Sequence, residues 1–181
     1  TARPTTGTRT LNSKNVLDFD GSTDFMSFTN GITGGSYTIF FVCLVDSLSA
    51  TLPRSVIGTD ATGGPVMRFA NTTSTGKMQV VRRGQSVLLT ANTTNVVATP
   101  YSFIITTYNS GNAVTRNGVA DGSNATSASY TQNIKAIGSE SSTSWSNGHD
   151  GIIAESAIYT GILTGPQITQ IINYSVAKWG V

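Results

Sequence analysis

The sequence has few charged side chains and no concentration of either sign. Only 11% of its 181 residues are Asp, Glu, Lys or Arg, and the formal net charge is +2. Nucleic-acid-binding proteins gather Lys and Arg into a basic stripe that neutralises phosphates. The 11 basic residues here are scattered, and only Arg82 and Arg83 are adjacent. We therefore expect no nucleic-acid partner.

Cysteine and long apolar runs are also scarce. The one cysteine, Cys43, cannot form an intrachain disulfide, and it lies in the apolar run of residues 38–45. A thiol in such a run is expected to pack as a small hydrophobic side chain, without a reactive role. No apolar stretch approaches the length of a membrane span, so we expect no membrane insertion.

What the chain does have is a repeated pattern of short apolar segments and turn residues. Segments rich in Val, Ile, Phe, Tyr and Thr alternate with Gly, Asn, Asp and Ser, which is typical of an antiparallel two-sheet β-sandwich. We predict a single domain over residues 1–181 that begins with an extended segment, residues 1–14. The predicted strands are residues 16–19, 25–28, 37–45, 56–58, 66–70, 78–82, 86–90, 101–108, 113–116, 135–137 and 151–159.

The segment 37–45 is apolar on both of its alternating faces, which predicts a central strand that is covered on both sides. One face carries Tyr37, Ile39, Phe41 and Cys43, and the other carries Phe40, Val42 and Leu44. We expect the chain's own second sheet or helix to cover the second face. The alternative is that this face contacts another copy in a homo-oligomer.

The last segment changes to a helical period and predicts one short closing helix, residues 164–180. Five residues fall on one face of it: Ile168, Ile171, Ile172, Ser175 and Trp179. Thr164 and Gln167 are placed to cap its start, and Gly180 is placed to end it. We expect Trp179 to pin this helix to a sheet.

Two separated segments carry a resemblance to a known family. Residues 16–25 (VLDFDGSTDF) and residues 148–159 (GHDGIIAESAIY) resemble the first and last signatures of laminin-G-like domains, which are concanavalin A-like jelly rolls. The hairpin of residues 101–108 and 113–119 and the closing residues 178–180 are similar as well. The resemblance implies a jelly-roll sandwich, a fold found in lectins, adhesins and phage structural proteins, and it implies little about activity.

The sequence offers no convincing catalytic set. Glycoside hydrolases with this fold need two carboxylates across the sugar, and the nearest pair on one strand, Asp18 and Asp20, belongs to the opening signature. The sole histidine, His149, has no nucleophile elbow near it, and we expect it in a solvent-facing loop. We predict that the protein is not an enzyme.

We also predict no metal site and no cofactor, with calcium as the alternative. Relatives of this fold hold calcium with loop carboxylates, and six aspartates are available: Asp18, Asp20, Asp24, Asp60, Asp121 and Asp150. They do not form a calcium-binding Asp-x-Asp-x-Asp-Gly loop. We expect Glu155 to be structural and to bond backbone near the end of its strand.

A glycan is the ligand that the loops favour. Trp145 offers a stacking face, and Asn147, His149 and Asp150 are nearby hydrogen-bonding groups. The competing interpretation is that Trp145 folds back as a cap on the core. Arg82, Arg83 and Tyr108 form a second candidate, for which a solvated sheet edge is the simpler interpretation. Both polar stretches, residues 121–129 and 139–147, are expected to be exposed loops.

Two functions fit these features. Residues 3–12 resemble the segment that precedes this signature in phage virion proteins and some bacterial surface proteins. The first prediction is a non-enzymatic structural or decoration protein on the outside of a phage virion, docked as a homo-oligomer on a capsid or tail lattice and able to hold glycans weakly. The alternative is a carbohydrate-binding adhesin or lectin module, extracellular or on a bacterial surface, that binds a cell-surface glycan.

Overall fold

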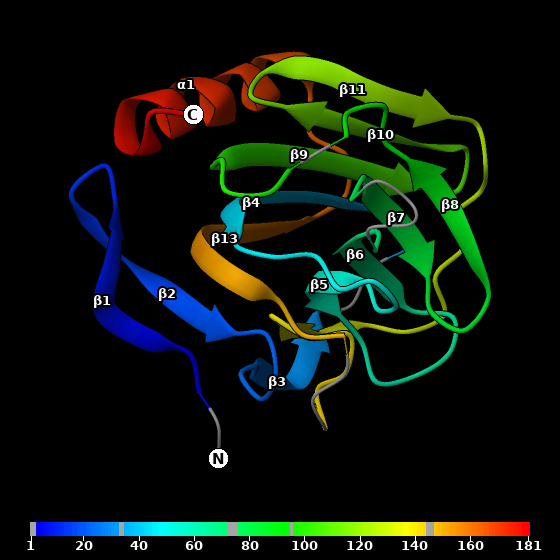
Figure 1. Cartoon of the computed structure of the whole chain (residues 1–181). Coiled ribbons are helices and arrows are strands. Elements are labelled where there is room, and N and C mark those ends of the chain that lie inside the picture. Colours follow the sequence, from blue (N-terminus) through cyan, green and yellow to red (C-terminus); the bar gives the residue numbers. More distant parts are fainter. Residues whose placement is uncertain (1–2, 33–34, 72–75, 95, 144–146) are drawn as a thin grey trace.

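The chain folds into two antiparallel sheets and one helix (Figure 1). The computed structural model describes residues 3–32, 35–71, 76–94, 96–143 and 147–181. The seven-stranded sheet has the order β1 (Thr5–Leu11), β2 (Lys14–Asp20), β13 (Asp150–Thr160), β4 (Tyr37–Val45), β9 (Tyr101–Tyr108), β10 (Gly111–Arg116), β11 (Val119–Asn124). The six-stranded sheet has the order β3 (Met26–Ile32), β12 (Ile134–Ile137), β5 (Arg54–Gly58), β6 (Pro65–Phe69), β7 (Met78–Arg82), β8 (Ser86–Thr90). The predicted β-sandwich is confirmed, and every predicted strand overlaps an observed one.

The main core lies between the two sheets. Tyr37, Ile39 and Phe41 of β4 are fully buried in it, because alternate residues of a strand point to the same face. The rings of Phe41 and Phe103, from adjacent strands, have centroids 5.3 Å apart. Cys43 belongs to the same cluster, and burial raises the pKa of its thiol. The predicted inert role of this cysteine agrees with its position.

A second, smaller core covers the outer face of the seven-stranded sheet. Phe40 and Val42 pack there against Ile171 and Trp179 of α1 (Gly165–Trp179), which lies across β4, β9 and β13 in Figure 1. Full burial of each large apolar side chain stabilises the fold by about 1.5–3 kcal/mol. The expected cover by the chain's own helix is therefore confirmed, as is the role of Trp179.

The ends of α1 also follow the sequence. The Gln167 side-chain oxygen accepts a hydrogen bond from the Thr164 backbone N–H at 2.9 Å. At the other end Gly180 has φ 77°, a left-handed conformation that favours glycine, and its N–H donates to the Val176 carbonyl at 3.0 Å. In the described part of the chain, no helix is long and apolar enough to cross a membrane.

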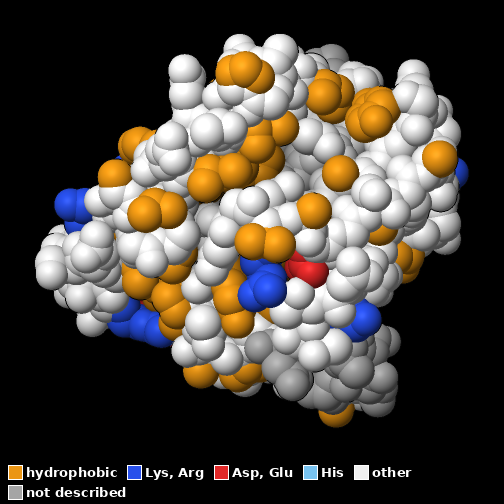
Figure 2. Space-filling model, turned by 90° about the horizontal axis from the view of Figure 1, so that it is seen from above, with side chains coloured by type: hydrophobic (Ala, Val, Ile, Leu, Met, Phe, Trp, Pro, Cys, Tyr) orange, Lys and Arg blue, Asp and Glu red, His pale blue; other side chains and the backbone are white. Residues whose placement is uncertain are grey.

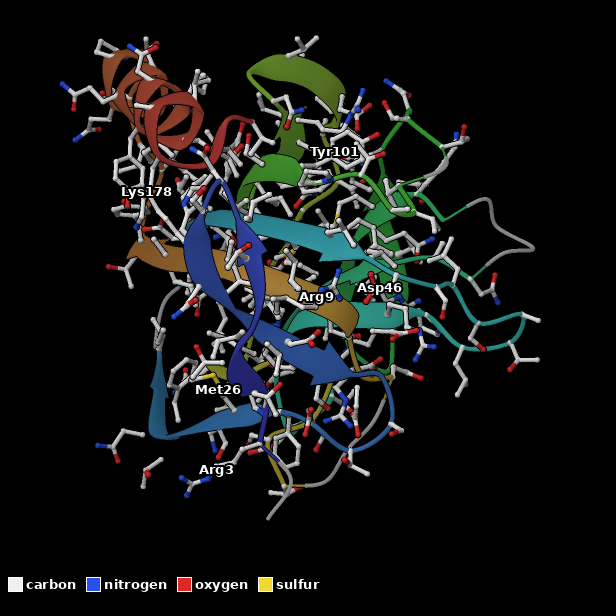
Figure 3. The ribbon with its side chains drawn as sticks, turned by 60° about the vertical axis from the view of Figure 1, so that its left-hand side comes forward. Arg3, Arg9, Met26, Asp46, Tyr101 and Lys178 are labelled. Carbon is white, nitrogen blue, oxygen red and sulfur yellow. The ribbon has the colours of Figure 1, made fainter. Side chains whose placement is uncertain are left out.

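Two regions in which no strand was predicted contain strands. Residues 5–11, expected to be an extended lead-in, form the edge strand β1 on β2, and Arg9 on it pairs with Asp46 at 3.0 Å (Figure 3). The stretch 121–129 was expected to be an exposed loop, yet β11 continues to Asn124 after the Asn117–Gly118 turn. Asp121 in β11 is buried and accepts hydrogen bonds from Thr93.

Candidate functional site on the outer face of the six-stranded sheet

Strands β6 and β7 present polar side chains on the face that points away from the core. Met67 and Phe69 of β6 lie in the core between the sheets, so Arg68 between them points outward. Gln79 of β7 lies directly opposite, and its side-chain oxygen accepts a hydrogen bond from Arg68 Nε at 3.1 Å. The Arg68 guanidinium group is thus held by Gln79 on the outer face of these two strands.

The segment after β12 crosses this same face. It can approach because β5 ends in Gly58, where a Cβ atom would lie 2.1 Å from the Ser139 carbonyl oxygen. The Thr59 N–H then donates to the Glu140 carbonyl at 3.0 Å. The prediction of an exposed loop over residues 139–147 is wrong at its start, because Ser139, Glu140 and Ser141 are buried.

Several side chains converge on the Glu140 carboxylate. Asn147 donates to it at 2.6 Å, and Arg68 Nη1 and Arg83 Nε lie 3.6 and 3.5 Å from its oxygens. Arg83 is held further by a 2.6 Å hydrogen bond from its Nη1 to the Thr59 carbonyl. We call this set the arginine–glutamate face; its members are Arg68, Gln79, Arg83, Glu140 and Asn147.

The side chains of the arginine–glutamate face are held by one another and are partly desolvated. The side chains of Arg68, Arg83 and Glu140 are 21%, 22% and 12% exposed, so their ion pairs are less screened than ordinary surface pairs. Two guanidinium groups face one carboxylate, which leaves one excess positive charge. Within the described residues, no hydrogen bond uses Nη2 of either arginine. The arrangement offers fixed planar donors to a ligand.

A second ion pair borders this face. Lys135 Nζ lies 3.3 Å from Asp60, and the Ser142 N–H donates to the same carboxylate at 2.8 Å. Burial by itself raises the pKa of Asp60, but the hydrogen bonds from Ser142 and Lys135 outweigh it, so that pKa is lowered. The charges of Lys135 and Asp60 cancel. Through Asp60, which also accepts the Ser142 hydrogen bond, the pair connects the crossing segment to β12.

The structure does not bring the predicted glycan ligands together as one surface. Asn147 belongs to the arginine–glutamate face, whereas Asp150 starts β13 and pairs with Arg54 at 3.4 Å. Trp145 lies outside the described residues. The glycan-binding role predicted for these residues stays a prediction.

His149 lies in the core, and the prediction of a solvent-facing histidine is wrong. Its ring packs edge-on against Phe19, with centroids 5.9 Å apart, and next to Phe69 at 6.5 Å. Its Nε2 lies 3.1 Å from the Ile152 carbonyl. Burial lowers the pKa of this imidazole to about 4, so the ring is neutral at physiological pH and presents no atom to an external ligand.

The second sequence candidate, Arg82, Arg83 and Tyr108, is divided as well. Arg83 joins the arginine–glutamate face, whereas Tyr108 ends β9 in the other sheet. Arg68 and Glu140 were missed by sequence reasoning. The signal that could have found Arg68 is a single charge inside the apolar strand PVMRF.

Glu155 is structural, as predicted, but its partners are not backbone groups. Its carboxylate accepts hydrogen bonds from Trp179 Nε1 at 2.5 Å, Tyr174 OH at 2.7 Å and Lys178 Nζ at 3.1 Å. All three donors belong to α1. The carboxylate therefore fastens the helix to strand β13.

No metal site emerges among the residues that the structure describes, where no three His, Cys, Asp or Glu side chains group together. Four of the six candidate aspartates pair with basic side chains: Asp18 with Arg9, Asp60 with Lys135, Asp121 with Arg116 and Asp150 with Arg54. Asp20 caps its own turn by accepting backbone hydrogen bonds from Ser22, Thr23 and Asp24. The predicted lack of a metal and its alternative, calcium binding, both stay predictions.

Comparison with known proteins supports the fold and leaves the activity open. No protein-family model and no curated protein matches the sequence. Among solved structures, domain 4 of AbnA, an extracellular GH43 arabinanase from Geobacillus stearothermophilus in complex with arabinotriose, has a TM-score of 0.68 at 15% identity, over 93% of this chain and 81% of that one.

Two further solved structures are similar. The Trypanosoma rangeli sialidase has a TM-score of 0.64 at 12% identity over 87% of this chain, which spans only 27% of the sialidase. The CBM40 domain of the Ruminococcus gnavus IT-sialidase, bound to α2,3-sialyllactose, has a TM-score of 0.55 at 14% identity, over 77% of this chain and 83% of that one. At such identities the likeness shows a shared jelly-roll-like fold. None of these proteins is a virion component by its description, and the virion setting stays a prediction.

Proposed function

We propose that this chain is a carbohydrate-binding domain and that its arginine–glutamate face contacts the glycan. The observation that carries the proposal is the convergence of Arg68, Arg83 and Asn147 on Glu140 at the outer face of the six-stranded sheet. The similar arabinanase domain and the CBM40 domain were both solved with oligosaccharides, which supports a glycan as ligand class. This is the alternative that the sequence offered beside a virion decoration protein.

The chemistry of this face suits sugar hydroxyl groups. A pyranose or furanose presents neighbouring hydroxyls that both donate and accept, and planar guanidinium, amide and carboxylate groups complement them. Because the side chains are already held by each other, little rotamer entropy is lost on binding. The extracellular setting of the arabinanase leads us to propose an extracellular or cell-surface location.

We expect binding without turnover. Glycosidases need one carboxylic acid that protonates the leaving group and a second carboxylate across the sugar. The Glu140 carboxylate is already engaged by two guanidinium groups and the Asn147 amide. It is therefore placed to orient donors, and it is poorly placed to serve as the acid.

A glycan array with the intact chain tests the proposal. We expect reproducible binding to at least one glycan class, and Arg68→Ala should weaken it tenfold or more, because a hydrogen bond from a charged group contributes about 1.5–3 kcal/mol. Arg3→Ala is the matched control, because Arg3 is exposed near the N-terminus (Figure 3) and does not belong to the arginine–glutamate face.

Two outcomes would contradict the proposal. One is a wild-type chain that binds no glycan on the array although its circular dichroism shows folded β structure. The other is glycan binding that is equal in wild type, Arg3→Ala and Arg68→Ala. A parallel Trp145→Ala sample tests the stacking role that the sequence predicts for that ring.

A further inference from the structure

A cleft of about 400 Å³ lies between α1 and the outer face of the seven-stranded sheet. This is the opposite side of the sandwich from the arginine–glutamate face, because the helix and the six-stranded sheet cover opposite faces of β4. Its apolar lining includes Phe40 of β4, Ala157 of β13 and Ile171 of α1. Nothing in the proposed function uses this cleft.

The sequence of β13 explains why the cleft exists. A bulge shifts the register between Ile153 and Glu155, so that Ala154 and Glu155 both turn toward the helix. From this point the side chains of β13 that face the helix are Glu155, Ala157 and Tyr159. The middle one is small and the two beside it are large. The small side chain of Ala157 leaves a depression between its two neighbours, and α1 bridges over it.

The walls of the cleft are aromatic and polar. The rings of Tyr159 and Tyr174 line it and are 38% and 43% exposed. Gln167 uses its side-chain oxygen at the helix start, which leaves its NH2 group for a ligand. The Gln170 amide also lines the cleft and makes no hydrogen bond to the residues that the structure describes.

The charges in the cleft balance. Glu155 is the one acidic residue in the lining, and Lys178 pairs with it at 3.1 Å, so an ionic ligand gains little there. A purely apolar ligand would cover the two glutamine amides without replacing their hydrogen bonds to water, which is costly. A neutral molecule with one apolar face and one hydroxylated edge satisfies both requirements.

We propose that this cleft is a second carbohydrate site, for one uncharged sugar ring. The C–H face of the ring would pack on Tyr159 and the apolar floor, and its hydroxyls would reach Gln167 and Gln170. The cleft volume lies at the small end of the range for ligand pockets, as a single ring requires. With sites on opposite faces, one domain can join two glycan chains.

The test is a titration of the 15N-labelled full chain, followed by NMR, with glucose, galactose, mannose, arabinose and N-acetylglucosamine in separate samples. We expect saturable millimolar binding of at least one sugar, seen in the Gln170 side-chain amide and the backbone amides of α1. Tyr159→Ala should weaken this binding tenfold or more. Tyr159→Phe retains the ring and should stay within a few-fold of wild type.

Arg68→Ala separates this site from the first one. It should leave the α1 titration unchanged, while Tyr159→Ala should leave array binding through the arginine–glutamate face unchanged. The proposal is overturned if no sugar of the panel gives saturable shifts in α1. It is equally overturned if such shifts persist unaltered in folded Tyr159→Ala. Shifts confined to residues around Arg68 would support the first site alone.

Discussion

At the scale of single residues, His149 shows how burial fixes a protonation state. Its ring is enclosed by Phe19 and Phe69, and burial lowers its pKa to about 4, against about 6.5 in an unfolded chain. Between these two values the unfolded chain binds more protons than the folded one. The contribution of His149 to the free energy of unfolding should therefore be constant above about pH 6.5 and fall as the pH drops toward 4.

The measurement is urea denaturation at a series of pH values on wild type and His149→Gln, which retains a donor toward Ile152. Protonation of His149 should cost wild type up to about 3 kcal/mol over this interval, a loss that the variant lacks. An NMR titration of the imidazole ring protons should give a pKa near 4. A ring that titrates near its ordinary value, or equal pH slopes in both proteins, would show that the buried position is wrong.

His149 also marks a limit of sequence reasoning at this scale. The residues around it in the chain are Ser, Asn, Gly and Asp, and such a polar setting predicted exposure. The rings that enclose it come from β2 and β6, which no local pattern connects to it. Trp179 was predictable because the helical period alone places it on the apolar face.

At the scale of elements, the carboxylate of Glu155 joins strand β13 to helix α1. Burial by itself raises its pKa, but hydrogen bonds from Trp179, Tyr174 and Lys178 outweigh it, so the pKa lies below its usual range. A carboxylate with a lowered folded pKa stabilises the fold above the unfolded value of about 4.3. That stabilisation is lost as the pH falls through the folded pKa.

Glu155→Gln should lower the free energy of unfolding at neutral pH by about 1–3 kcal/mol, because a charged acceptor for three donors is lost. The variant should also lose less stability in acid than wild type, and chemical denaturation at both pH values measures this. Trp179→Phe is the matched control, since it removes one donor and keeps a buried ring. Equal stability of Glu155→Gln and wild type would show that the carboxylate does not hold the helix.

An element could be predicted from the sequence when core packing stabilises it, and was missed when strand pairing alone stabilises it. Strands β4, β7, β8 and β9 match their predicted bounds because core packing imposes an apolar pattern on them. Strand β1 (TTGTRTL) is mostly exposed at a sheet edge, so only pairing with β2 makes it a strand. The arginine–glutamate face could not be predicted from the sequence either, because Arg68 and Glu140 come together only where the segment after β12 crosses β5.

At the scale of the whole molecule, the outer surface around α1 is apolar and nearly uncharged. Figure 2 shows hydrophobic side chains gathered over the helix and the neighbouring strands, with few charges among them. Val176 of α1 and Val119 of β11 are 56% and 68% exposed. The low content of charged residues in the sequence is thus reflected in this surface. Hydroxyl and amide groups provide most of the surface polarity.

The topology makes the two cores one cooperative unit. The last strand, β13, lies between β2 and β4, so the seven-stranded sheet is completed only when the C-terminal part of the chain is in place. The two faces of β4 line the two cores: Phe41 packs between the sheets, and Phe40 packs under α1. If either core unfolds, one apolar face of β4 becomes exposed to solvent. We therefore expect a single unfolding transition.

Trp145→Phe makes this testable, because the chain has two tryptophans and Trp179 then reports alone on the contact between α1 and the sheet. Its fluorescence and the far-ultraviolet circular dichroism of the strands should give the same denaturant midpoint. Refolding should take milliseconds to seconds, since pairing of β13 with β2 closes most of the chain into one loop. If Trp179 fluorescence changes at lower denaturant than the strand signal, α1 detaches first and the two cores are independent.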